Sequence, residues 1–382
     1  MSETMLLVRG AQVFDPAPIG QQDLLLAGGR IVAIAPRISP GAGLSVRILD
    51  AAGRIAVPGL VDSLVHVSGG GGEGGFDTRT PALAPSQALA SGITTFIGAL
   101  GTDDVTRSHA DLLACCRALA AHGLTAYALT GSYRVPVRTL TGSVRDDLVL
   151  VPDIIGVGEI AIADHRGSQP SVDELARIAS DARVGGLLSG KAGTVLVHVG
   201  DARDGLALLH AVSDRHPVPT TQWHPTHINR HADLLAQAAA WVGRGGSVDI
   251  TTSTSVDLLN AGEVAAAQAL AHLLESGLPV SRITLSSDGQ ASLPNFDAQG
   301  RLLGMAVADV GSLLRSLAEG VTRHGLPLAA ALPAVTSTPA DVWGLRRKGR
   351  LAVGADADLL LLAPGTLALE AVVASGQLRW GG

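Results

Sequence analysis

Short apolar runs alternate with longer windows rich in alanine and leucine through the middle of the chain. Runs without strict alternation of apolar and polar residues are typical of parallel strands that are buried on both faces. Eight runs fit this description, at 60–65, 94–100, 125–129, 154–161, 194–199, 219–223, 247–251 and 283–286. Eight such strands separated by helical windows predict an α/β fold of the (β/α)8 type, a TIM-type barrel.

The two ends of the chain have a different pattern, with short apolar runs bounded by glycine and proline, as in antiparallel sheets. These runs lie at 5–14, 22–26, 30–34, 366–374 and 377–380. We expect both ends to form one small β-sandwich beside the barrel, which predicts domains at 1–57, 58–344 and 345–382. An open doubly wound sheet is the alternative to the barrel. It is less well supported because no glycine-rich nucleotide-binding turn follows the first strand.

Composition narrows the class of protein. Apolar residues make up 47% of the 382 residues and charged residues 16%, which is enough to bury a large core. The net charge of −6 argues against a nucleic-acid partner, because phosphate binding needs a basic face. The apolar run at 359–363 is far shorter than the roughly 20 residues of a membrane span. The only cysteines, Cys115 and Cys116, are adjacent and cannot form an ordinary disulfide, so we expect a reducing cytoplasm.

Five residues with metal-ligand chemistry fall at or near the ends of five predicted strands. They are His66, Glu159, His198, His227 and Asp288. Active sites of such barrels gather at the carboxyl ends of the strands. Any one histidine is more often a hydrogen-bonded structural residue, but five ligand-type residues at five strand ends rarely arise from packing alone. Imidazoles with carboxylates are the ligands that zinc prefers, so the sequence predicts a site for one or two divalent ions.

Two longer segments resemble the amidohydrolase superfamily. Val-Pro-Gly-Leu-Val-Asp-Ser-Leu-Val-His at 57–66 resembles the start of its barrel, and 349–359 resembles its return into the small sandwich. Within the superfamily the chain is most similar to the isoaspartyl dipeptidases. The motifs that carry this likeness lie at 69–73, 100–102, 129–133, 139–143, 164–166, 225–230 and 286–289. The resemblance covers nearly the whole chain.

The chain departs from that family at the metal site. Leu64 stands where the family has the first histidine of its His-x-His pair, and Glu159 stands where it has a carbamylated lysine. Only Lys191 and Lys348 are lysines, and neither lies near this point in the sequence, so we do not expect a carbamate bridge. A glutamate can bridge two cations as a bidentate carboxylate. Gly158 would allow the backbone shift that the shorter side chain needs, and His224 is a possible replacement ligand.

The resemblance also implies roles for the other residues. Asp288 would carry a proton from water to the leaving amine, and Tyr133 would hydrogen-bond the carbonyl oxygen. The expected substrate-binding residues are Glu73, Gly71, Thr102, Arg166, Arg230 and Ser292. Glu73 would pair with the substrate ammonium, and the two arginines would each hold a carboxylate.

The sequence therefore predicts a metal-dependent hydrolase that cleaves an amide bond in a small substrate, most simply a β-aspartyl dipeptide. Two alternatives stay open. One is a related amidohydrolase that acts on a cyclic amide or an N-acyl amino acid. The other is a non-catalytic protein that binds dipeptides, motivated by the lost histidine at Leu64. The resemblance also implies a homo-oligomer of several subunits.

Overall fold

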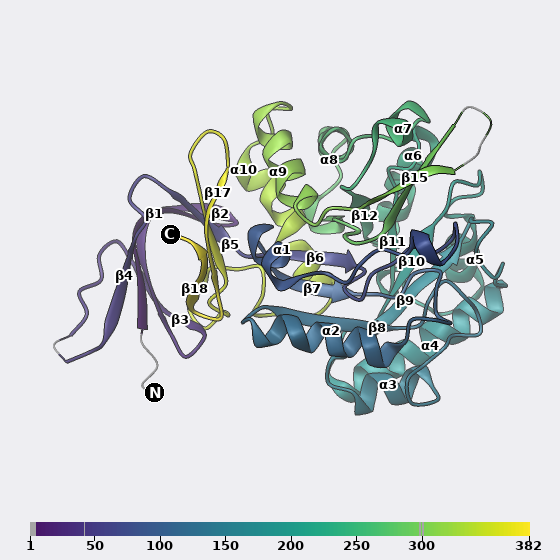
Figure 1. Cartoon of the computed structure of the whole chain (residues 1–382), viewed down its shortest axis with the longest axis horizontal. Coiled ribbons are helices and arrows are strands. Elements are labelled where there is room, and N and C mark those ends of the chain that lie inside the picture. The colour runs from purple at the N-terminus through teal and green to yellow at the C-terminus, as the bar shows by residue number, and fades with distance from the viewer. Residues whose placement is uncertain (1–4, 42, 298, 300–301) are drawn as a thin grey trace.

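The structure is a computed structural model that describes residues 5–41, 43–297, 299 and 302–382. It has two parts. A sheet at one side of the molecule holds both chain ends, and a parallel sheet wrapped by helices forms the other side (Figure 1). Within the described residues, no helix combines the length and the apolar character that a membrane crossing needs.

The eight predicted parallel strands all form. They are β6 (Leu60–Val65), β7 (Ile93–Gly98), β8 (Thr125–Thr130), β9 (Ile154–Ile162), β10 (Thr194–Val199), β11 (Trp223–Thr226), β12 (Val248–Thr251) and β13 (Ile283–Ser286). Strands β6 to β11 pair in chain order, and β12 pairs with β13. The helices between and after them are α1 (Pro85–Ala90), α2 (His109–Ala121), α3 (Val144–Leu150), α4 (Val172–Ser189), α5 (Ala207–Arg215), α6 (Ala232–Gly243), α7 (Val256–Asn260), α8 (Ala266–Glu275), α9 (Ser312–Thr322), α10 (Leu328–Ala331) and α11 (Ser337–Val342).

Strands β6–β11 and the pair β12–β13 are joined to each other by further backbone hydrogen bonds, which curl the sheet. The amide of Ile228, after β11, donates to Asp249 O in β12 at 3.1 Å. The amide of Asp288, after β13, donates to Leu64 O in β6 at 3.0 Å, and the amide of His66 donates to Gly289 O at 2.8 Å. The first and last strands are thereby brought together. The fold is an α/β fold with a curled parallel sheet, consistent with a TIM-type barrel.

The sixth strand differs from its predicted position, which was 219–223. Residues Thr220–Gln222 form a 3-10 turn instead, with the Gln222 amide donating to Pro219 O at 2.9 Å. The strand begins at Trp223, which pairs with Val195 of β10. The strand has only four residues. A sequence pattern this short does not show where the turn ends and the strand begins.

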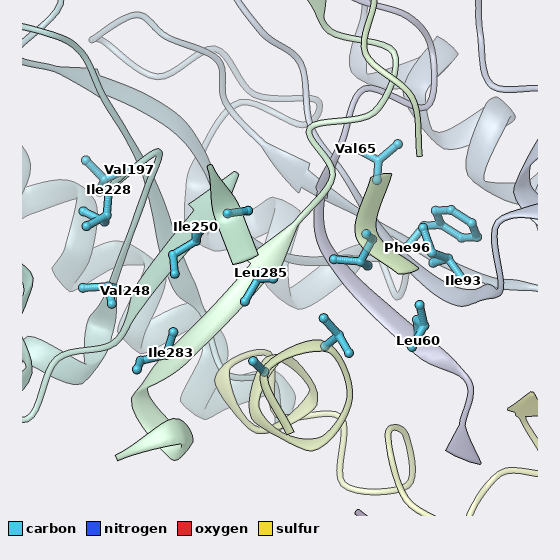
Figure 2. Close-up of a cluster of buried hydrophobic side chains, with 14 of the residues drawn as sticks. Leu60, Val65, Ile93, Phe96, Val197, Ile228, Val248, Ile250, Ile283 and Leu285 are labelled. Atoms are coloured by element: carbon cyan, nitrogen blue, oxygen red, sulfur yellow. The ribbon is translucent and has the colours of Figure 1, made fainter. Parts of the chain in front are cut away.

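The parallel strands are buried on both faces, as their continuous apolar character predicted. Figure 2 shows side chains from the first and last strands, Leu60, Ile283 and Leu285 among them, packed in the same core. Inside the curled sheet, a second apolar cluster joins Leu64, Ile97, Ala99, Leu129, Ile155, Leu196 and Trp343. This cluster forms part of the interior of the curled sheet, and the predicted site residues lie at the carboxyl ends of the strands.

Strands from both chain ends share one mixed eight-stranded sheet. Its members are β1 (Met5–Asp15), β2 (Ala17–Ala27), β3 (Arg30–Ala35), β4 (Val46–Asp50), β5 (Ile55–Pro58), β16 (Leu359–Leu362), β17 (Leu369–Ala374) and β18 (Gln377–Gly381). The pairing of β5 with β16 joins the two ends, with Leu359 opposite Pro58. A separate hairpin, β14 (Ser292–Phe296) and β15 (Leu302–Val307), follows the last parallel strand and was not predicted.

Lys348 connects the two parts of the molecule. Its side chain is 8% exposed, and its ammonium donates to Thr125 Oγ1, at the start of β8, at 2.6 Å. It also contacts Asp358 at 2.7 Å and Asp356 at 2.9 Å, just before β16. Burial opposes its charge, but the two carboxylates outweigh this and raise the pKa of Lys348. One buried cation thus compensates two acidic groups at the junction.

We predict that Lys348→Met lowers the free energy of unfolding by about 3–5 kcal/mol, because it leaves the buried Asp358 carboxylate without its cation. Urea denaturation would measure the loss. The exposed Arg346, two residues away, provides the matched control, since Arg346→Met removes the same charge from solvent. Equal effects of the two substitutions would contradict the role given to Lys348.

Gly158 allows β9 and β10 to approach each other closely. Its φ of 148° lies in a region that side chains rarely adopt. A Cβ atom placed there would lie 2.7 Å from Leu196 Cβ and 2.9 Å from Leu196 O. Both atoms belong to a fully buried residue of β10 and cannot move aside cheaply.

We predict that Gly158→Ala destabilises the protein by on the order of 3 kcal/mol, through backbone strain and overpacking. Thermal unfolding would reveal the change as a lower midpoint. Gly243→Ala is the control, because a Cβ atom at the end of α6 meets nothing within 4 Å. An unchanged midpoint for Gly158→Ala would show that a side chain at this position can be accommodated beside Leu196, which would contradict the prediction.

Candidate active site

A cavity of about 560 Å³ opens beside the carboxyl ends of the parallel strands. Eleven of the twelve predicted site residues line it: His66, Gly71, Glu73, Thr102, Tyr133, Arg166, His198, His227, Arg230, Asp288 and Ser292. The twelfth, Glu159, is fully buried behind them in β9 and contacts the histidines. The structure thus brings all the predicted residues together, although they come from segments spread over more than 200 positions.

The two oxygens of Glu159 face different imidazoles. Oε2 lies 3.3 Å from His198 Nδ1 and 3.3 Å from His227 Nε2. Oε1 lies 3.6 Å from His66 Nε2, which is itself 3.1 Å from Asp288 Oδ1. Ligand atoms of Glu159, His198 and His227 all lie within 4.8 Å of one another. The carboxylate therefore stands between two groups of potential ligands.

Each imidazole is oriented by a hydrogen bond from its other nitrogen. His66 Nδ1 lies 3.2 Å from Ala99 O, which can only accept, so this nitrogen carries the proton. His198 Nε2 lies 2.9 Å from Asp164 Oδ2, which likewise places its proton away from Glu159. The nitrogen of each ring nearer Glu159 can then donate to the carboxylate when the ring is protonated, or offer its lone pair to a cation when the ring is neutral. Such outer partners fix the tautomer that a metal ligand needs.

The third ring, His227, is held in the same way by Thr251 Oγ1, 2.6 Å from its Nδ1. His227 also has a φ of 63°, and Asp288 has a φ of 52°. Residues other than glycine rarely adopt this left-handed region, at a cost of order 1–3 kcal/mol each. Two such residues that face one cavity indicate that the surrounding structure holds them there for function.

The electrostatics follow from burial and proximity. Burial disfavours an ionised Glu159, but hydrogen bonds with His198 and His227 outweigh it and hold the pKa of Glu159 well below its usual range. Burial lowers the pKa of His227 to about 4. Burial also opposes a charged His66, yet Asp288 and Glu159 raise the pKa of that ring to about 9. The site therefore has a surplus of negative charge next to buried imidazoles.

The residues present fit a divalent cation. Glu159 Oε1 is a buried atom with no hydrogen-bond partner among the described residues, and the nearest imidazole nitrogen, His66 Nε2, is 3.6 Å away. Unpaired buried carboxylate oxygens are costly unless a cation approaches them. Three ligand atoms with room on the open side are the arrangement of a catalytic rather than a closed structural site.

The departures from the family pattern have physical explanations. Leu64 packs in the interior apolar cluster described above and cannot act as a ligand. The ammonium of Lys191 donates to the carbonyls of Leu148, Val151 and Ile154 at 2.6–2.7 Å, so it does not reach the cavity. His224 does not line the cavity either. It is fully buried between Ser247 and Thr284, where burial lowers its pKa to about 3.

The glycine-rich loop is held in place rather than acting as a free linker. Arg107 is buried and donates to Ser68 O, and at 2.9 Å to both Gly70 O and Thr80 O. Gly71 has a φ of 71°, and a Cβ atom there would meet Thr78 O at 2.7 Å. These contacts fix the backbone that carries Glu73 into the cavity.

Glu73 is the centre of a polar group at the rim. Thr102 Oγ1 donates to its Oε1 at 2.9 Å, and Ser292 Oγ to its Oε2 at 3.3 Å. Arg166 NH1 lies 3.5 Å from Glu73 Oε1. These three partners come from three separate segments of the chain, which together hold the carboxylate at the cavity.

The two arginines are held differently. Arg166 donates through Nε and NH2 to both oxygens of Asp164, at 3.0 and 2.7 Å, which leaves NH1 directed to the cavity. Arg230 donates through Nε to Val199 O at 2.8 Å, and its NH2 lies 3.3 Å from His198 Nε2. The Tyr133 hydroxyl is 2.7 Å from His198 Nδ1 and so reaches the candidate ligand atoms.

Sequence reasoning missed several residues in the cavity wall and directly behind it. Asp164 links His198 to Arg166 and holds both in place. It follows β9 by two positions, so the strand-end rule that identified the ligands could have identified it. Glu263 and the apolar residues Leu258, Leu293 and Met305 also line the cavity. They lie on or after α7 and on the late hairpin, where no strand-end rule applies.

Comparisons with known proteins agree with this geometry. A solved structure of a β-aspartyl dipeptidase from Fervidobacterium islandicum, in complex with a β-Asp-Leu dipeptide, is 39% identical. Its TM-score is 0.93, and the match covers 100% of this chain and 97% of that one. A second β-aspartyl dipeptidase structure from the same organism is 37% identical, with a TM-score of 0.90 and a match over 99% of this chain and 97% of that one.

An allantoinase from Deinococcus radiodurans is 27% identical over 94% of this chain and 87% of its own length. Residues 55–378 match the Amidohydrolase family, which covers most of the chain including every residue that lines the cavity. The resemblance seen in the sequence is therefore confirmed. The chain belongs to the amidohydrolase family and is a hydrolytic enzyme.

Proposed function

We propose that the enzyme hydrolyses the amide bond of β-aspartyl dipeptides with the help of one or two zinc ions. The observation that carries the proposal is the arrangement around Glu159. A buried carboxylate faces three oriented imidazoles. The cavity in front of it is lined by two guanidinium groups and by the carboxylates of Glu73, Glu263 and Asp288. The similarity to β-aspartyl dipeptidases supports the choice of substrate.

Glu159, His198 and His227 would hold the first cation, because their ligand atoms already converge. His66 and Asp288, on the other side of Glu159, would hold a second more weakly, since Leu64 supplies no ligand there. Imidazole and carboxylate ligands in this combination suit zinc. When bound, a divalent cation there supplies Lewis acidity for the amide carbonyl and lowers the pKa of water.

Asp288 would accept a proton from the attacking water and return it to the leaving amine. Its Oδ1 lies 3.1 Å from His66 Nε2, and the residue lines the cavity, so it is placed to exchange a proton with water there. Tyr133 would donate a hydrogen bond to the carbonyl oxygen as negative charge develops on it. Burial keeps the pKa of Tyr133 well above its usual value, so the hydroxyl retains its proton for this task.

The charges of a β-aspartyl dipeptide match the rest of the cavity. Its ammonium would pair with Glu73, which Thr102, Ser292 and the loop at Gly71 keep in position. Its two carboxylates would meet Arg166 NH1 and Arg230. Opposite charges placed in this order would fix the direction in which the dipeptide binds.

A cyclic amide is the second candidate substrate, because the allantoinase similarity extends over almost the whole chain. Such a ring carries fewer charges than a dipeptide and would leave Glu73 and the guanidinium groups without partners. Comparison of the two substrate classes on the same zinc-loaded protein separates these candidates.

We expect purified protein to hold about one or two ions per chain, and Glu159→Gln to reduce that content to less than half. The amide of glutamine offers no negative charge to a cation, although it has nearly the same shape. Elemental analysis after dialysis without chelator would measure both. Glu275→Gln, at the exposed end of α8, is the control. Equal metal content in all three proteins would contradict the assignment of Glu159.

We expect zinc-loaded protein to hydrolyse β-Asp-Leu, and His227→Ala to lower kcat/KM by about 10³-fold. The loss follows because one of three converging ligands is gone. The assay measures the released leucine by chromatography. His272→Ala, on the exposed face of α8, should keep full activity. Binding of the dipeptide without any turnover would instead favour a non-catalytic binding protein.

A further inference from the structure

Part of the cavity wall has no role in the proposed chemistry. Leu258 of α7, and Leu293 and Met305 of the β14–β15 hairpin, present apolar side chains to the cavity. Glu263, just after α7, lines the same side. We call these four residues the α7–hairpin wall. Ligand pockets are commonly lined by apolar side chains with a few polar groups that set specificity, and this wall has that character.

The carboxylate of Glu263 is not a mobile surface group. The amide of Val264 donates to Asn229 O at 2.8 Å, and Asn229 Nδ2 donates back to Val264 O at 2.8 Å. The Glu263 amide also donates to Leu258 O at 3.0 Å. Asn229 lies directly before Arg230 and two residues after His227, so these bonds fix Glu263 relative to the centre of the site.

The Glu263 carboxyl group is only partly compensated, by a hydrogen bond with Thr254 and by the more distant charge of Arg230. Its Oε1 is buried and has no hydrogen-bond partner within the part of the chain that the structure describes. No ion pair within 4.0 Å joins it to a described arginine, lysine or histidine, although Arg230 is close enough to influence its charge. Burial raises the pKa of Glu263, as expected for a carboxyl group that has lost water without gaining a cation.

The proposed binding mode supplies the missing partner. If Arg230 holds the C-terminal carboxylate of the dipeptide, the side chain of that second residue projects beside Arg230, where Glu263 lies. Glu73, Arg166 and Arg230 already account for the three charges of the dipeptide backbone. Glu263 is therefore available to form an ion pair with a basic side chain on the second residue of the dipeptide. Lysine and arginine combine an apolar stem with a cationic end, which matches the apolar residues and the carboxylate of the wall.

We propose that the α7–hairpin wall is the subsite for the second residue of the dipeptide, and that it favours long side chains with a basic end. The inference rests on the proposed function and adds the class of substrate. It implies discrimination against an acidic second residue, because a like charge would be brought next to Glu263 in a partly dry site.

The test compares kcat and KM for β-Asp-Lys, β-Asp-Leu and β-Asp-Glu with the wild-type enzyme and Glu263→Gln. We expect wild-type kcat/KM to fall in that order, with β-Asp-Glu at least about tenfold below β-Asp-Leu. Glu263→Gln should raise KM for β-Asp-Lys by about five- to tenfold, improve β-Asp-Glu, and change β-Asp-Leu less than about twofold. Glu275→Gln, equally conservative but on the exposed end of α8, should change none of the three.

The outcomes separate the two proposals. If β-Asp-Leu is cleaved but Glu263→Gln alters all three substrates equally, or none, the subsite assignment is wrong while the dipeptidase activity stands. If wild-type protein loaded with zinc cleaves none of the three, the proposed function itself fails. A change confined to kcat would also overturn the subsite, because a binding contact shared by ground state and transition state acts through KM.

Discussion

The buried charge of Glu159 is the constraint on which the rest of the structure depends. A carboxylate with no access to water needs compensation from several directions, and three imidazoles in or directly after three different strands provide it. This requirement sets the register of β9 against its neighbours, since a slip of one residue would turn Glu159 to the opposite face. It also explains why Gly158 lies directly before it, where a side chain would keep β9 from its place beside Leu196.

The positions of the three histidines depend in turn on several other strands of the sheet. Each ring is oriented by a group from another segment, namely Ala99 after β7, Asp164 after β9 and Thr251 of β12. The geometry of the site is therefore a property of the whole curled sheet and not of one loop. Directly beneath, Leu64 and the apolar cluster around Trp343 keep water away from the ligands. The lost histidine thus became part of the floor of the site.

Much of this could be predicted from the sequence, for identifiable reasons. Strands buried on both faces leave continuous apolar runs, so seven of the eight were placed closely, while the sixth was predicted at 219–223 and begins only at Trp223. The strand ends indicated the ligands. The hairpin at β14 and β15 was missed because its residues follow no strand-end or glycine-rich signal. The short strands β4, β5 and β16 were also missed, since they exist only through pairing with distant partners. Asp164 follows β9 closely enough for the strand-end rule to have identified it, whereas the position of Glu263 in the cavity wall depends on tertiary contacts that local patterns do not contain.

The sheet that holds both chain ends has a consequence for the order of folding. Strand β5 pairs with β16, and about 300 positions separate Ile55–Pro58 from Leu359–Leu362. During synthesis, the N-terminal strands must therefore wait, with one edge of β5 open, until almost the entire chain has left the ribosome. An open strand edge is a template for pairing with other chains. The newly made protein is thus most exposed to aggregation just before its last strands emerge, and the C-terminal residues act as the closing step of assembly.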